Sequence, residues 1–295
     1  NKPDTIIHCA AFSNVELCQQ APRKADISNN KLAELVAKSS LARSIKLVHI
    51  STDHLSNGQN AMVNEEAECV PLNEYAKTKL LGEHAVLDCN PDALVLRLNF
   101  FGWGPVYRPT FTDWIIECLS NRHCVTLYEN VFFTPLYAGE IVSLAHRLID
   151  ENASGIFNLS SSDRISKHTF GLKIAEKFDL DTSLIRVGKY PKAPRVPRPL
   201  DMSLDNSKLR KTLGLKRLGI DNSISALKAD RVIRSTILTN SYKSAIIPFL
   251  ARIKKRISYL GEFRYGLINV IKKPINRNLG MVNRYLDLID EVHTN

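Results

Sequence analysis

Short apolar runs alternate with longer stretches of helical periodicity over the first hundred residues. The apolar runs cover residues 5–11, 45–50 and 93–98, and continuous runs of this kind are typical of strands buried on both faces of a sheet. Residues 22–44 carry an apolar stripe at helical spacings, made of Ile27, Leu32, Leu35, Val36 and Leu41, and a second helix is expected to begin near Asn73. Strands that alternate with helices in this way predict right-handed crossovers and a parallel sheet.

After Pro105 the pattern changes to shorter and more mixed elements. The expected elements are helices over 112–119 and 138–149, extended chain over 125–136 and a strand over 155–159. A further helix is expected to be capped by Ser166, with Phe170 and Ile174 on one apolar stripe. Residues 190–199 contain too many prolines for a regular element, which predicts a loop.

The composition is that of a globular protein, with 44% hydrophobic and 24% charged residues in a chain of 295. No apolar run reaches the roughly 18 residues needed to cross a bilayer, so we expect a cytoplasmic protein. The six cysteines lack a CxxC or similar spacing, which predicts reduced thiols and no metal site. Of the net charge of +10, a charge of +8 lies from Lys228 onward, and the nearly neutral remainder argues against nucleic-acid binding.

Polar side chains follow the predicted strands, at the edge where parallel sheets bind their ligands. Ser51 and Thr52 follow the second apolar run, and Asn99 follows the third. The segment Tyr75-Ala-Lys-Thr-Lys79 places a phenol and an ammonium one helical turn apart. Because an ammonium favours the phenolate, we expect a lowered pKa for Tyr75 and acid–base chemistry there. The simpler alternative is a solvated helix face.

A series of short motifs runs in order through residues 1–227. They are His8-Cys9-Ala10-Ala11-Phe12-Ser13-Asn14-Val15, Ser51-Thr52-Asp53, Pro71-Leu72-Asn73-Glu74-Tyr75 with Lys79, Leu81-Gly82-Glu83, Arg97-Leu98-Asn99-Phe100-Phe101-Gly102, Thr134-Pro135, Gly155-Ile156-Phe157-Asn158 and Arg198-Pro199-Leu200-Asp201-Met202-Ser203-Leu204-Asp205. In this order they resemble dTDP-4-dehydrorhamnose reductase (RmlD-like) and its relatives, which are extended short-chain dehydrogenases/reductases that act on nucleotide sugars.

The resemblance implies reduction of a nucleotide-linked 4-keto sugar by NADPH or NADH. Tyr75 would protonate the C4 oxygen of the sugar, Lys79 would hold the nicotinamide ribose, and Thr52 would hydrogen-bond the carbonyl. Asn29 would support the surroundings of the lysine. Implied cofactor contacts are Ala10, Ala11, Ser51, Tyr75, Lys79 and Asn99, and implied substrate contacts are Asn14, Phe100 and Arg198.

The same resemblance implies an α/β fold, with a Rossmann-type doubly wound parallel sheet and a smaller α+β substrate domain. The expected segments are a partial NAD(P)-binding domain over 1–104 with elements from 125–150, sugar-nucleotide segments over 105–227, and a helical extension over 228–295. The family begins with a strand and a glycine-rich turn that binds the pyrophosphate. None of the 13 glycines has that spacing. We therefore expect the first strands to be missing, by truncation or by loss, and the chain alone to be inactive.

The basic extension over 228–295 has a pattern of its own. Apolar residues recur at intervals of three and four over 247–260, among several lysines and arginines. This predicts a basic amphipathic helix, which is a type of helix that binds anionic membrane surfaces. Packing on the protein itself or on a partner, including a second copy in a homodimer, is the simpler interpretation.

Two other functions remain open at this point. A sugar-nucleotide epimerase or dehydratase would keep the same tyrosine and lysine but retain its cofactor through the cycle. A regulatory or remnant subunit would keep the fold without the cofactor turn.

Asp201 and Asp205 are better explained by turn and cap roles than as a carboxylate pair for glycoside chemistry. His54 is expected in a surface loop, and His8 in the core.

Overall fold

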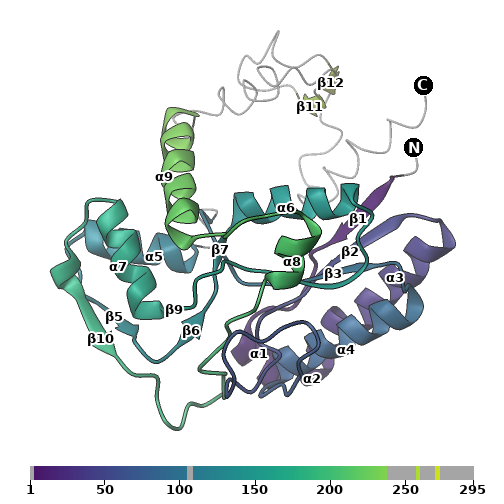
Figure 1. Ribbon diagram of the computed structural model, residues 1–295, viewed down its shortest axis with the longest axis horizontal. Helices are drawn as coiled ribbons and strands as arrows, with labels where there is room; N and C mark the ends of the chain where they lie inside the picture. Colours follow the sequence, from purple (N-terminus) through teal and green to yellow (C-terminus); the bar gives the residue numbers. More distant parts are fainter. Residues whose placement is uncertain (1–2, 105–108, 238–256, 260–269, 273–295) are drawn as a thin grey trace. The chain divides into compact units, whose positions relative to one another are not determined.

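The computed structural model describes residues 3–104, 109–237, 257–259 and 270–272 (Figure 1). Residues Lys2–Lys228 form one compact unit, and residues from Ala229 onward belong to another. All of the strand-end groups singled out from the sequence lie in the first unit.

A four-stranded parallel sheet forms the centre of this unit, in the order β1-β2-β3-β8. The strands are β1 (Thr5–His8), β2 (Lys46–Ile50), β3 (Leu94–Leu98) and β8 (Gly155–Leu159). The α/β fold and the parallel sheet predicted from the alternating pattern are confirmed. The first strand is shorter than the apolar run over 5–11, because His8 is the last residue of β1 that pairs with β2.

Helices cover both faces of the sheet, because successive strand residues point to opposite sides. Val95 packs with Ala33 and Val86 of the helices on one face, whereas Leu94 and Leu96 pack on the other. The helices of the first face are α3 (Leu32–Ala42), which continues α2 (Pro22–Asp26) and the π-helical turn η1 (Ile27–Lys31), and α4 (Glu74–Cys89). Those of the second face are α6 (Ala138–Asp150) and α8 (Ser207–Thr212).

The helical run from α2 to α3 confirms the helix predicted over 22–44, but it buries a different stripe. Ile27 and Leu35 are 54% and 61% exposed, while Ala33 and Ala37 are fully buried. Small residues face α4 because the two backbones approach closely. A Cβ atom on Gly82 of α4 would lie only 2.3 Å from the backbone oxygen of Asn29.

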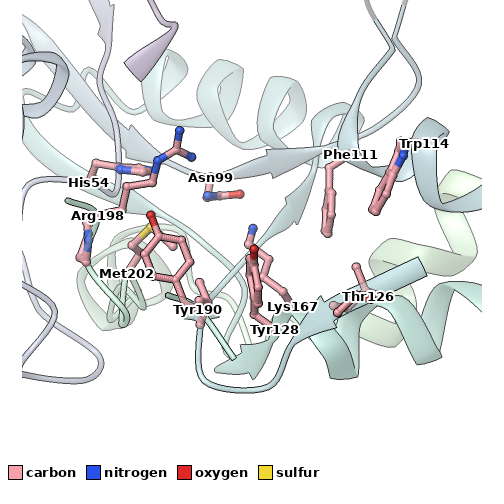
Figure 2. Close-up of a pocket in the computed structure, with 13 residues that line it drawn as sticks. His54, Asn99, Phe111, Trp114, Thr126, Tyr128, Lys167, Tyr190, Arg198 and Met202 are labelled. Atoms are coloured by element: carbon pink, nitrogen blue, oxygen red, sulfur yellow. The ribbon is translucent and has the colours of Figure 1, made fainter. Parts of the chain in front are cut away.

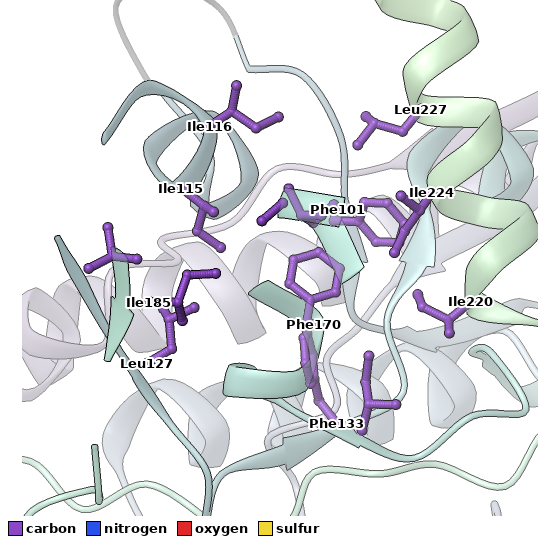
Figure 3. Close-up of a cluster of buried hydrophobic side chains, with 14 of the residues drawn as sticks. Phe101, Ile115, Ile116, Leu127, Phe133, Phe170, Ile185, Ile220, Ile224 and Leu227 are labelled. Atoms are coloured by element: carbon purple, nitrogen blue, oxygen red, sulfur yellow. The ribbon is translucent and has the colours of Figure 1, made fainter. Parts of the chain in front are cut away.

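The later segments build a second cluster of mixed elements around Phe170, which is fully buried (Figure 3). The rings of Phe101 and Phe133 lie 5.2 Å and 5.5 Å from that of Phe170, both edge-on. The N-cap predicted at Ser166 is confirmed, since its hydroxyl accepts a hydrogen bond from the backbone N–H of Thr169.

The remaining elements lie in this unit, except that α9 begins in it and continues past its last residue, Lys228. They are α1 (Val15–Gln20), β4 (Phe100–Phe101), α5 (Phe111–Ser120), β5 (Val125–Tyr128), β6 (Phe132–Phe133), β7 (Leu136–Tyr137), β9 (Ile165–Ser166), α7 (Lys167–Lys177), the 3-10 turn η2 (Thr182–Leu184), β10 (Ile185–Gly188) and α9 (Ile220–Ile237). The chain over 190–199 has no helix or strand, as its prolines predict.

The prediction of a helix over 247–260 is wrong at its C-terminal end. Residues Ile257–Tyr259 form strand β11, which pairs in parallel with β12 (Val270–Lys272). Both strands contain β-branched residues, which favour extended chain over helix. The rest of the predicted helix lies outside the described residues. Over the described ranges, the structure contains no helix with both the length and the apolar character of a membrane span.

The close approach of α4 to the π-helical turn can be tested with Gly82→Ala. The added methyl group would meet the Asn29 carbonyl, a backbone atom that cannot move aside cheaply. We expect a loss of about 1–3 kcal/mol in the free energy of unfolding, measured by urea denaturation. Gly219→Ala is the matched control, because its Cβ would make only an ordinary contact. Equal stabilities of the two variants would contradict this packing.

Candidate active site

The carboxyl ends of β2 and β3 meet at one buried group of polar side chains. Ser51, Thr52 and Asp53 are each buried. The side-chain amide of Asn99, after β3, donates to the Asp53 carboxylate at 2.6 Å. The hydroxyl of Ser51 is buried and has no hydrogen-bond partner in the part of the chain that the structure describes. The strand ends therefore converge as the sequence predicted, with one polar group still available to a ligand.

Tyr75 lies in the first turn of α4 and faces this group. Asn73 caps the helix by accepting from the Ala76 N–H at 2.9 Å, and its own amide donates to the carbonyl of Pro197 at 2.9 Å. The cap therefore ties the start of α4 to the proline-rich loop. The Thr52 hydroxyl lies beside the Tyr75 phenol and acts on its pKa, and it also donates to the Asp53 carboxylate at 3.3 Å.

The lowered pKa expected for Tyr75 is wrong. Burial raises the pKa of this phenol to about 12, the Thr52 hydroxyl opposes the rise, and the nearby Asp53 carboxylate adds to it. The spacing of Tyr75 and Lys79 suggested a stabilised phenolate, but desolvation dominates in the buried site. Tyr75 is consequently a neutral phenol at about pH 7, which is the state of a proton donor.

Lys79 is buried one turn further along α4, and its amine contacts the end of β2. Nζ donates to the backbone carbonyl of Ile50 at 2.6 Å and lies 3.4 Å from Nε2 of His49. Burial lowers the pKa of Lys79 to about 8, although the carboxylate of Glu83 opposes the fall. Glu83 is itself paired with Arg97 at 2.7 Å, so it is not a dedicated partner for the lysine.

Asn29 connects the segment after β1 to α4. Its side-chain oxygen accepts from the backbone N–H of Phe12 at 2.7 Å, and its amide donates to the hydroxyl of Thr78 at 3.0 Å. Thr78 directly precedes Lys79. The buried amide thus lies beside the lysine's helical turn, where the sequence placed a supporting role for it.

A pocket of about 400 Å³ opens beside the strand-end group (Figure 2). Its walls come from segments far apart in the sequence. They are lined by His54, Asn99, Phe111, Trp114, Thr126, Leu127, Tyr128, Val131, Lys167, Tyr190, Arg198, Pro199 and Met202. Figure 2 shows His54 and Arg198 at one end of the pocket, the aromatic pair of Phe111 and Trp114 at the other, and Lys167 between them.

Lys167 is a pocket residue that the sequence analysis missed. It begins α7, next to the cap Ser166, and its ammonium lies 3.4 Å from the ring centre of Phe133. Burial lowers its pKa to about 8, against the attraction of Asp53. Its sequence position gave one usable signal, a lysine at the first position of a helix. That position places a cation where the helix dipole is unfavourable to it.

His54 is also placed differently from the expectation of a surface loop. Its side chain is 17% exposed, and its ring meets that of Tyr75 edge-on at 5.9 Å between centroids. Burial lowers its pKa, while Asp53 acts in the opposite direction. Nδ1 is buried without a partner among the described residues. His54 therefore links Tyr75 to the pocket wall.

The remaining site residues named from the sequence are dispersed. Ala10 and Ala11 are exposed just after β1. Phe100 is 59% exposed and is not part of the pocket lining. Asn14 uses its side-chain oxygen to cap α1, whereas Arg198 lines the pocket and pairs with Glu16.

The two aspartates considered for glycoside chemistry have structural partners. Asp201 accepts from Arg164 and from the hydroxyl and N–H of Ser203. Asp205 accepts from the N–H and hydroxyl of Ser207 at the start of α8. These contacts confirm the turn role, whereas the N-cap position of α8 is occupied by Asn206. His8 is buried as expected, but only one of its ring nitrogens has a partner in the described part of the chain.

The fold and the convergent strand ends define a Rossmann-type α/β protein of the short-chain dehydrogenase/reductase kind. The chain belongs to the RmlD substrate binding domain family, whose model matches residues 1–230. The resemblance inferred from the motifs is thereby confirmed, and the chain is a protein of the sugar-nucleotide reductase type.

Three similar proteins illustrate the range of the family. A probable low-salt glycan biosynthesis reductase, Agl14 of Haloferax volcanii, is 33% identical over 236 residues, which are 77% of each chain. Methionine adenosyltransferase 2 subunit beta of Xenopus tropicalis is 30% identical, over 80% of this chain and 74% of that one. The crystal structure of dTDP-4-dehydrorhamnose reductase from Bacillus anthracis in complex with NADP has a TM-score of 0.72 at 22% identity, covering 77% of this chain and 81% of that one.

The burial of the Lys79 ammonium predicts a pH dependence of the free energy of unfolding. Its folded-state pKa of about 8 lies below the ordinary 10.5, so the folded protein binds fewer protons than the unfolded chain between these pH values. The cost of burying the charge is therefore full below about pH 8 and is relieved as the pH rises. At about pH 7, removal of this cost in Lys79→Met should raise the free energy of unfolding by up to about 3 kcal/mol. Loss of the hydrogen bond to Ile50 reduces this gain.

The measurement is the free energy of unfolding of Lys79→Met and of the unmodified protein at a series of pH values. The advantage of the variant should shrink as the pH rises from about 8 towards 10.5. Lys77→Met, which removes an exposed lysine of the same helix, is the matched control and should show no such trend. A pH-independent difference for Lys79→Met would contradict a charged, buried amine.

Proposed function

We propose that this protein reduces a nucleotide-linked 4-keto sugar with NADPH or NADH, using Tyr75 as the proton donor. The observation that carries the proposal is the half-buried neutral phenol, which lies beside the Thr52 hydroxyl and next to a pocket with cations on its walls. The relative from Haloferax volcanii, named a probable reductase of glycan biosynthesis, supports a reaction of this class.

The groups at the strand ends fit the nicotinamide-ribose part of the cofactor. The unpartnered Ser51 hydroxyl and the Lys79 amine supply polar contacts. The small, exposed side chains of Ala10 and Ala11 let a ring or sugar approach the backbone. When bound, the cofactor supplies a hydride to C4 of the sugar.

The protein's own residues handle the proton and the carbonyl oxygen. Thr52 and Tyr75 present their hydroxyl groups together, so both can hydrogen-bond the C4 oxygen and orient it. As negative charge develops on that oxygen, Tyr75 transfers its proton to it and becomes a phenolate. The ammonium of Lys79, one turn away, stabilises this phenolate by its charge.

The pocket is suited to the nucleotide part of the substrate. Lys167 and Arg198 place two cations on its walls, and cations of this kind bind a diphosphate by charge and by hydrogen bonds. At the far end, the rings of Phe111 and Trp114 are stacked at 5.9 Å between centroids. Both rings are partly exposed, and such a surface suits a planar base or sugar face.

A second candidate is a non-catalytic subunit that keeps the fold. The similarity to proteins named methionine adenosyltransferase 2 subunit beta favours it, because that name describes a subunit of another enzyme.

An epimerase or dehydratase on the same scaffold is distinguished from a reductase by its use of the cofactor. A reductase consumes one NAD(P)H per sugar, whereas those enzymes show no net consumption and a bare subunit shows no turnover.

Tyr75→Phe removes the proposed acid and leaves the shape of the side chain. We expect kcat to fall by about 10²–10⁴-fold, with little change in the dissociation constant of NADPH, because the phenol hydroxyl acts on the sugar oxygen. The assay follows NADPH oxidation with a dTDP-linked 4-keto-6-deoxy sugar, using the protein with whatever sequence precedes residue 1 in its gene.

Thr52 provides a matched pair of variants for the same assay. Thr52→Ser keeps the hydroxyl and should retain most of the activity, whereas Thr52→Val keeps the shape and should lose it. Unchanged turnover in Tyr75→Phe would remove Tyr75 from the mechanism. NADPH binding without turnover in the unmodified protein, across dTDP-, UDP- and GDP-linked keto sugars, would favour the subunit.

A further inference from the structure

The two cations of the pocket have different surroundings. The ammonium of Lys167 lies against aromatic rings, 3.4 Å from the ring centre of Phe133 and 5.2 Å from that of Phe111. It pairs with no carboxylate among the residues that the structure describes. The guanidinium of Arg198 instead forms an ion pair with the carboxylate of Glu16. Only the arginine is therefore occupied by an anion of the protein itself.

The ion pair of Glu16 and Arg198 joins two distant parts of the sequence. Glu16 lies in the first turn of α1, whereas Arg198 lies near the end of the proline-rich loop and lines the pocket. Figure 2 shows Arg198 at the same end of the pocket as His54, whose ring contacts that of Tyr75. The carboxylate thus holds a pocket cation close to the candidate catalytic group.

The backbone on both sides of Arg198 is fixed by hydrogen bonds. The carbonyl of Pro197 accepts from the side-chain amide of Asn73 at 2.9 Å. The carbonyl of Leu200 accepts from the backbone N–H of Phe132 at 2.7 Å. A change of partner for the guanidinium is therefore a rotation of the arginine side chain, and the loop does not need to open.

The exposure of the pair allows this exchange of partners. The side chains of Arg198 and Glu16 are 35% and 50% exposed, and ion pairs at such exposure are weak. A diphosphate offers several charged oxygens, and its hydrogen bonds with a guanidinium are charge-assisted and bidentate. The released carboxylate of Glu16 is solvated by water. Both effects favour the phosphate as the partner of the arginine.

A ligand inside the pocket has a further advantage over Glu16. Burial lowers the pKa of both Lys167 and His54, and the charge of Arg198 lowers each of them further. The charge of the arginine therefore acts on the space that these side chains line. Glu16 is not among the lining residues. An anion in the pocket interacts with Lys167 and Arg198 together, whereas Glu16 pairs with the arginine alone.

We propose that Glu16 occupies the guanidinium of Arg198 in the free protein and yields it to the phosphate groups of a bound nucleotide. Glu16 is then a specificity-determining residue, because a nucleoside diphosphate replaces the carboxylate whereas a nucleoside without phosphate leaves the pair intact. The proposal rests on the proposed function only in taking the pocket as the site of the nucleotide, and it does not depend on reduction of a sugar.

The test is a calorimetric titration with dTDP, which needs neither a cofactor nor a keto sugar. Glu16→Gln removes the charge of the carboxylate and keeps the length of the side chain. The Kd of dTDP should fall by about three- to fivefold in this variant, because the pair no longer has to be broken. The Kd of thymidine, which has no phosphate, should stay the same. Salt at about 0.15 M limits the general effect of the changed net charge.

Two further variants isolate the pair from other effects of charge. Glu129→Gln is the matched control, because it removes an exposed carboxylate that pairs with Lys189 outside the pocket. It should leave the Kd of dTDP unchanged. Arg198→Gln should weaken dTDP binding, and Glu16→Gln should give no gain when combined with it, since the double-mutant cycle measures the interaction of the two side chains.

Several outcomes would overturn the exchange of partners. They are an unchanged or higher Kd of dTDP in Glu16→Gln, an equal gain for thymidine, an equal gain in the Arg198→Gln background, and no dTDP binding by either the unmodified protein or Glu16→Gln. The reductase function fails separately, in the turnover assay. A protein whose Glu16→Gln variant binds dTDP more tightly, but which reduces no keto sugar, would support the exchange and contradict the reductase.

Discussion

The hydrogen bond from Lys79 to the carbonyl of Ile50 is the contact on which the candidate site depends. At 2.6 Å it joins α4 to the last residue of β2, immediately before Ser51 and Thr52. A buried ammonium costs free energy unless it has hydrogen-bonding partners. Lys79 has two such partners, the carbonyl of Ile50 and the imidazole of His49, and neither carries a negative charge. The surrounding packing must therefore compensate, through the closely packed α3 and α4 and the buried ion pair of Arg97 and Glu83.

This arrangement assigns different tasks to the two parts of the compact unit. Helix α4 supplies the phenol and the amine, and the end of β2 supplies the hydroxyl, so each is positioned by regular secondary structure. The later segments supply a pocket with cations and aromatic rings, built from residues between His54 and Met202. His54 and Asn99 belong to both parts, since they contact Tyr75 and Asp53 respectively and also line the pocket. In the proposed reaction, His54 and Asn99 therefore connect the residues that act on the carbonyl with the residues that bind the nucleotide part of the substrate.

Much of the fold was predictable because the strands are buried on both faces and so appear as continuous apolar runs. The cap at Ser166 was readable for a local reason, since a side chain there satisfies a backbone N–H a few residues on. The convergence of the segments after β2 and β3 followed from the rule that parallel strands end at one edge, whereas the place of Tyr75 beside Thr52 was implied by the resemblance. None of these inferences required knowledge of distant contacts.

The errors have a common physical origin in tertiary burial. The stripe of Ile27 and Leu35 has helical spacing, but the helix buries its alanines because α4 approaches too closely for larger side chains. The pKa of Tyr75 rises because desolvation outweighs the opposing effect of Thr52, and a spacing rule contains no term for burial. Lys167 and His54 were missed or misplaced because the pocket joins segments more than a hundred residues apart.

The central claim is that the strand-end site directs a hydride to the carbonyl carbon of a nucleotide-linked sugar. The most direct measurement follows deuterium from NADPH labelled at C4 of the nicotinamide into a dTDP-linked 4-keto-6-deoxy sugar, with NMR of the product. The proposed function predicts deuterium at C4 of the sugar and an equal amount of NADP⁺. Deuterium absent from the sugar, or returned to the cofactor without net oxidation, would contradict it.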